Sequence, residues 1–172
     1  MKFRSNFLRR TVAAVLALGL VGAVSCEAPT IPPDQNPENF TLVSCPNTVA
    51  RTTQAVIGPL GGTLSLAGTT IGIPSGALSV PTLITLTIPA SPYMEIDVRA
   101  NDLLSFVFNR PIGVRIDYSR CTDPVVNQAR LSVWHIDAQS KALLENMGGT
   151  DNKTANTIDF TTGHLSNYAI AF

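Results

Sequence analysis

Apolar and small polar residues alternate along much of the chain, most clearly over residues 61–88, GGTLSLAGTTIGIPSGALSVPTLITLTI. The two-residue period puts Leu64 and Leu66 on one face of a strand and continues in Ile71 and Ile73 and again at residues 84–88. A sheet that packs one face on a core and exposes the other gives this pattern. We therefore predict three strands here, with turns at residues 61–62, 67–68 and 74–77.

The same alternation recurs in the C-terminal half. Further strands are predicted at residues 105–108, 112–116, 131–136, 156–162 and 168–172, with turns at residues 89–92, 109–111, 138–141 and 148–153. No segment has the 3.6-residue period of a convincing helix, and residues 142–147 fit a helical turn or a hairpin strand. Many short strands separated by turns at this spacing predict an all-β fold, an antiparallel β-sandwich.

Two of these strands have distinctive faces. Residues 131–136 are apolar on both sides apart from Ser132 and His135, so we expect this strand inside a sheet. The last strand places Tyr168, Ile170 and Phe172 on one face and alanines on the other.

The first 26 residues differ from the rest. Four basic residues precede an uncharged run at residues 11–24, as in a secretory signal peptide. The run is shorter than the roughly 20 residues needed to cross a bilayer, and no later stretch replaces it. The sequence Ala23-Val24-Ser25-Cys26 resembles the lipobox of bacterial lipoproteins. This resemblance implies export, lipidation of Cys26 and attachment to a bacterial membrane on its periplasmic or cell-surface face.

Composition divides the remainder in two. Residues 27–45 contain four prolines before residue 38 and predict a semi-extended tether. Residues 46–172 suffice for one domain with a core of its own.

Without residues 1–26 the chain has eight basic and twelve acidic residues, a net charge of about −4. It has no basic stripe for phosphates, which argues against nucleic acid as a partner. Membrane contact would come from the acyl chains on Cys26.

The chain has three cysteines. Acylation of Cys26 would leave Cys45 and Cys121, which we predict to form a disulfide in an oxidising compartment. By closing a loop, the bond would stabilise the folded state by at most roughly 4 kcal/mol. Two separate thiols are the alternative.

A Gly-Gly-x-Leu opening at residues 61–64 and Ile-Pro-x-Gly-Ala-Leu at residues 73–78 resemble the ZU-five domain of zonula occludens proteins, netrin receptors and ankyrins. Pro74 would end the pairing of the preceding strand, and Gly76 can adopt a positive φ. The likeness is good over residues 56–88 and looser at residues 106–118 and 164–169. It implies a β-sandwich and, since eukaryotic members are mainly protein-binding modules, a binding role.

The triplet His164-Leu165-Ser166 is the place where this resemblance suggests chemistry. Some members of the family cut themselves at His-Phe-Ser. By that analogy Ser166 would attack the Leu165 carbonyl with assistance from His164. The alternative is that His164 and Ser166 lie on the polar side where the last strand begins.

No other group of residues predicts a catalytic, metal or cofactor site. His135 and His164 have no partner at ligand spacing, and Asp137 would lie on the same face as His135. Several oxygen-bearing side chains could bind calcium but form no complete loop, so we expect them to cap turns or lie at sheet edges: Glu95, Asp97, Asp151 and Asn152. Residues 58–62, GPLGG, lack the lysine and following helix of a phosphate loop.

The aromatic residues Trp134, Tyr93, Tyr118 and Tyr168 would form a binding patch if exposed, but the alternation buries most of them. We therefore expect a lipid-anchored, exported bacterial binding or structural module that mediates protein interaction at the cell envelope. The alternative is an enzyme, either self-cleaving between Leu165 and Ser166 or a hydrolase with an unrecognised site.

Overall fold

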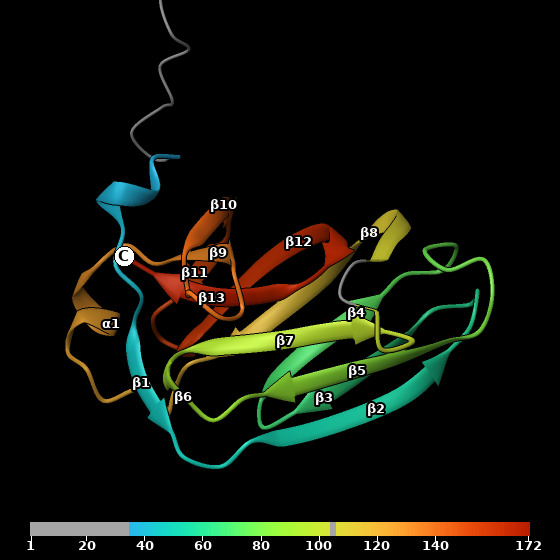
Figure 1. Cartoon of the computed structure of the whole chain (residues 1–172), viewed down its shortest axis with the longest axis horizontal. Helices are drawn as coiled ribbons and strands as arrows, with labels where there is room; N and C mark the ends of the chain where they lie inside the picture. Colours follow the sequence, from blue (N-terminus) through green and yellow to red (C-terminus); the bar gives the residue numbers. More distant parts are fainter. Residues whose placement is uncertain (1–34, 104–105) are drawn as a thin grey trace, which may run out of the picture. The chain divides into compact units, whose positions relative to one another are not determined.

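The computed structural model describes residues 35–103 and 106–172 (Figure 1). The strands are β1 (Ser44–Asn47), β2 (Arg51–Ile57), β3 (Gly62–Leu66), β4 (Thr69–Ile73), β5 (Thr82–Ile88), β6 (Ser91–Tyr93), β7 (Glu95–Ala100), β8 (Phe106–Asp117), β9 (Ser132–Ile136), β10 (Leu143–Gly148), β11 (Thr150–Asn152), β12 (Thr157–Leu165) and β13 (Asn167–Ala171). A 3₁₀ turn, η1 (Pro37–Asn39), and one helical turn, α1 (Val125–Gln128), are added to them.

The strands form two large sheets and one small one, and every pair is antiparallel. The six-stranded sheet has the order β10-β9-β13-β7-β5-β2, the five-stranded sheet β11-β12-β8-β4-β3, and β1 pairs with β6. The chain passes repeatedly from one large sheet to the other, and the main core contains buried residues from both. The predicted antiparallel β-sandwich is therefore confirmed.

Strand β5 shows how the sequence pattern produces the core. Ile84, Leu86 and Ile88 are buried, and the residues between them are partly exposed. Burying each of these side chains contributes roughly 1.5–3 kcal/mol. The small polar side chains between them lie on the opposite face of the strand.

Strands β9 and β13 are buried on both faces, as predicted for residues 131–136. On the face away from the main core, Trp134, Ile136 and the alanines of β13 form a second cluster, covered by Phe40, Leu42 and Leu143. The rings of Phe40 and Trp134 lie 4.8 Å apart, and the Thr41 and Phe172 backbones exchange two hydrogen bonds. Residues 40–43, in the expected tether, thus pack along the domain.

The predicted disulfide between Cys45 and Cys121 is confirmed, with a Cα–Cα distance of 4.9 Å. It joins β1 to the segment that precedes α1. The guanidinium of Arg120 donates to the Cys45 carbonyl at 2.8 Å and supports the same junction.

The turn predicted at residues 109–111 is wrong, because β8 continues through it. Along β12 the pairing advances only from Thr162 to His164, while along β8 it moves from Ile112 to Val107. The intervening residues of β8 therefore form a large bulge, and Pro111 is tolerated because a bulge needs no ladder N–H there. The Asn109 N–H donates instead to the Ala77 carbonyl.

Three other segments either decide between predicted alternatives or differ from the prediction. Residues 142–147 form the hairpin strand β10, and the turn predicted at residues 148–153 contains β11. The helical turn α1 was not predicted; Asp123 accepts from the Val125 N–H at its start, and Val126 is buried.

No helix in the described ranges is long and apolar enough to cross a membrane. The predicted signal peptide and Cys26 lie outside the described residues.

Candidate functional site

Three strands bring together two histidines and a glutamate far apart in the sequence. His135 lies on β9, and Glu145 is its register partner on β10. His164 lies near the end of β12, in the other sheet, one residue before the chain leaves that strand. Ser166 is the single residue between β12 and β13, where the chain passes from the five-stranded to the six-stranded sheet.

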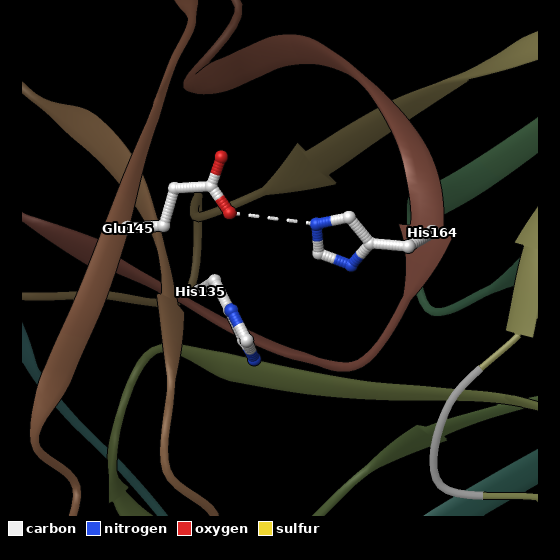
Figure 2. A group of neighbouring side chains, drawn as sticks. All are labelled: His135, Glu145 and His164. Atoms are coloured by element: carbon white, nitrogen blue, oxygen red, sulfur yellow. Dashed lines mark ion pairs between the residues drawn. The ribbon is translucent and has the colours of Figure 1, made fainter.

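The three side chains face one another (Figure 2). The distance from His164 Nε2 to Glu145 Oε2 is 3.5 Å, and one potential ligand atom from each of the three residues lies within 4.8 Å of the others. The rings of His135 and His164 lie 5.4 Å apart and meet edge to face. The Glu145 side chain is 59% exposed and that of His164 31%, so the cluster opens to solvent.

Hydrogen bonds from neighbouring residues hold the ring of His135 and the backbone of His164. His135 Nε2 lies 2.7 Å from the Ser166 hydroxyl. The buried Tyr168 hydroxyl donates to the His164 carbonyl and lies 3.4 Å from His164 Nδ1. Thr162, also buried, donates to the same carbonyl and accepts from the His164 N–H. His164 is therefore fixed by its backbone more than by its ring.

The surroundings favour a neutral His135. Burial lowers the pKa of His135, neighbouring His164 lowers it further, and Glu145 opposes both. Burial also raises the pKa of Tyr168 to about 12, so its hydroxyl keeps its proton at neutral pH. A neutral imidazole can accept a proton from a hydroxyl or bind a metal ion.

Asp137 does not join this group. Its carboxylate accepts from the Gln139 and Ser140 backbones and from the Ser140 hydroxyl in the turn after β9. These hydrogen bonds from Ser140, followed by that from Gln139, lower the pKa of Asp137. The residue predicted beside His135 is therefore a turn residue.

Each carboxylate that could bind calcium instead forms an ion pair with a lysine or arginine side chain. Glu95, 2% exposed, binds Lys141 Nζ through both oxygens at 2.8 Å. Asp97 pairs with Arg99 at 2.8 Å. Asp151 binds Lys153 at 2.6 Å and accepts from the Tyr118 hydroxyl. The expectation that Glu95 lies at a solvated edge is wrong, because Lys141 neutralises it in a buried position.

The aromatic side chains do not form an exposed patch. Trp134, Tyr118 and Tyr168 are buried, as the alternation predicts, and Tyr93 is half-buried. A shallow hollow of about 600 Å³ over the five-stranded sheet is lined in part by Arg115 and Asp159. These two charges form hydrogen bonds of 2.8 and 3.0 Å with each other. The hollow therefore offers no converging carboxylates for hydrolysis.

The sequence did not predict that the two histidines lie close together or that Glu145 lies beside them. The register of the β9–β10 hairpin, which contains two irregularities, brings Glu145 opposite His135. Packing of one sheet on the other brings His164 to them. Neither relation leaves a spacing motif in the sequence.

Comparisons with known proteins find no match for this chain among family models, and none among curated protein sequences.

Proposed function

We propose that this protein is an exported, lipid-anchored bacterial module with a ZU-five-like β-sandwich that binds a protein partner at the cell envelope. The proposal rests on the signal-like N-terminus, Cys26 and the motif at residues 56–88. The structural observation that carries it is a group of exposed apolar side chains at one end of the sandwich, which we name the apolar loop end. Its members are Val56, Leu60, Val80 and Leu103.

Strand pairing places these residues together. Val56 pairs with Leu83 at the start of β5, and Val80 precedes that strand. Leu60 lies in the turn after β2 and is 90% exposed. Leu103 follows β7, whose last residue pairs with β5. Exposed apolar groups of this kind mark interaction surfaces in many soluble proteins.

Hydrogen bonds join the loops of this end to one another. The Gly76 N–H donates to the Pro59 carbonyl, and the Asn109 N–H donates to Ala77. Asn109 also donates to the Ser79 hydroxyl. A surface whose loops are already ordered loses less conformational entropy when it binds.

The chain reaches the domain at the other end. Residues 41–43 pair with the end of β13, whereas the start of β13 pairs with β7 nearer the apolar loop end. Figure 1 shows η1 and the C-terminus on the left and the loops that follow β2 and β4 on the right. Residues 41–43 therefore lie away from the apolar loop end.

Charged substitutions test the binding surface. Leu60→Asp with Val80→Asp should abolish chemical crosslinking to the partner in cells, because a charge opposes burial of these positions. The matched control is Val49→Asp with Leu144→Asp, two exposed apolar residues outside this end, which should leave the crosslinked species unchanged. Equal crosslinking by both variants would contradict the proposal.

The contact between Ser166 and His135 favours a second candidate, self-cleavage between Leu165 and Ser166. At 2.7 Å, His135 Nε2 can accept the hydroxyl proton, the role that the sequence had given to His164. Attack of Oγ on the Leu165 carbonyl carbon would form an ester and break the peptide bond to the Ser166 nitrogen, which would take the proton from His135 and leave as an amine. Water would then hydrolyse the ester to a Leu165 carboxylate and free the Ser166 hydroxyl. Within the described ranges neither residue has a positive φ, so no strain of that kind drives the step.

Because the cleaved segment would stay paired in the sheet, cleavage must be measured on the unfolded protein. The released residues 166–172 contain β13, which pairs with β7 and β9 and would remain bound. Mass spectrometry under denaturing conditions would show a seven-residue loss in the wild type and none in His135→Gln or Ser166→Ala. An uncut wild-type chain would eliminate this candidate.

A further inference from the structure

We propose that His135, Glu145 and His164 form a binding site for a divalent transition-metal ion of the zinc class. The site goes beyond the proposed binding function and uses a different surface. Two imidazoles and a carboxylate are a ligand set that zinc takes in proteins. Each donor comes from a different strand, β9, β10 or β12, so the site depends on the tertiary fold.

The separations suit one small ion. Zinc lies about 2.0–2.1 Å from each nitrogen or oxygen ligand, so two ligands at a tetrahedral angle lie about 3.4 Å apart. His164 Nε2 and Glu145 Oε2 are already 3.5 Å apart. The third donor, within 4.8 Å of both, needs to approach by up to about 1.4 Å to complete the set. The exposed Glu145 side chain can supply much of this movement.

The ring orientation of His135 fits a ligand. In Figure 2 the ring nitrogen of His135 that is bonded to Cγ, Nδ1, lies nearer to Glu145 and His164. The other ring nitrogen, Nε2, points away from them. Nε2 is held by Ser166. Metal-binding histidines usually have their second nitrogen held by such a partner, which fixes the ring and its tautomer. The arrangement leaves Nδ1 for the ion.

His164 offers its other nitrogen. Nε2 faces Glu145, and Nδ1 lies on the side of the buried Tyr168 hydroxyl. Three protein ligands and an opening to solvent leave a fourth position for water. Glu145 supplies one negative charge, which offsets part of the charge of the ion.

Isothermal titration of the full chain, without a histidine tag, with Zn²⁺ alone tests the site. We expect one equivalent to bind in the micromolar range or tighter, and Glu145→Gln to weaken binding at least tenfold. Glu145 is largely exposed, so this variant should fold. Glu38→Gln, another exposed glutamate, is the matched control and should bind as the wild type does.

Nuclear magnetic resonance gives an independent readout. Zn²⁺ should shift the ring signals of both His135 and His164, whereas Mg²⁺, which prefers oxygen ligands, should shift neither. Stoichiometric binding that is unchanged in Glu145→Gln, or ring signals that do not respond to Zn²⁺, would overturn the proposal.

Discussion

At the scale of single residues, His135 decides which chemistry its surroundings can perform. With its proton on Nδ1, Nε2 can accept the proton of Ser166 and act as a base. With a metal ion on Nδ1, the proton is on Nε2, and the ring donates to Ser166 instead. The two uses exclude each other, so Zn²⁺ should suppress any cleavage at Ser166.

The lowered pKa of His135 makes folding stability depend on pH. Because the unfolded chain takes up this proton more readily, the neutral form of His135 favours the folded state. That contribution is present above the ordinary histidine pKa of about 6.5 and is lost as pH falls through the lower folded value. The groups facing the ring are Ser166, Glu145, His164 and Tyr168.

The free energy of unfolding should therefore decrease between pH 7 and 5 more steeply in the wild type than in His135→Gln. Urea titration of both proteins at each pH measures this difference. Parallel curves for the two proteins would show that His135 does not titrate differently on folding.

The glycines of the ZU-five-like motif give a graded test. Gly76 has a φ of 79°, but an added Cβ would meet only ordinary contacts with Arg110, the closest at 3.6 Å. Gly61 has a φ of 80°, and its Cβ would lie 2.3 Å from the Ile73 carbonyl oxygen. Gly76→Ala should cost about 1–2 kcal/mol from φ alone, and Gly61→Ala clearly more. Gly113→Ala, with open space around it, is the control; equal urea midpoints for all three would contradict this account.

At the scale of elements, the ion pair between Lys141 and Glu95 joins the β9–β10 turn to the start of β7. Lys141→Met would leave the buried carboxylate unpaired and should lower the free energy of unfolding by about 3–5 kcal/mol. Arg115→Met breaks an exposed pair with Asp159 that solvent screens, so its cost should be much smaller than that of Lys141→Met. Chemical denaturation would measure both, and similar losses would show that burial does not decide the cost.

Local alternation was enough to predict most strands, because one buried face leaves a two-residue period, as in β5. It did not predict β2 or β7, and it failed at Pro111, where a bulge replaces the expected turn, and at α1, which is too short for a periodic signal. The site was not predictable for a different reason. His135, Glu145 and His164 meet through strand register and sheet packing, which a single sequence does not encode as spacing.

At the scale of the whole molecule, the proposed function requires a lipid anchor at Cys26, a tether and the β-sandwich domain. Cys26→Ala should move the protein from the membrane to the soluble fraction, because the acyl chains would provide its attachment. Fractionation followed by immunoblotting measures this. Continued dependence on detergent would contradict lipidation at Cys26.

The disulfide contributes at the same scale, since it fixes the last part of the tether to the domain. Cys45 and Cys121 close a loop of 76 residues, and residues 40–43 are held beside β13 by backbone hydrogen bonds. The junction between tether and domain is therefore set by covalent and hydrogen bonds together, which keeps the apolar loop end at the far side.

The most direct test of the proposed function is site-specific photo-crosslinking in cells. A photoreactive residue at position 60 of the full chain should capture one defined protein, and the same residue at position 49, which is also exposed but lies outside the apolar loop end, should not. Capture of that protein with equal efficiency from both positions, or no capture from position 60, would contradict binding through the apolar loop end.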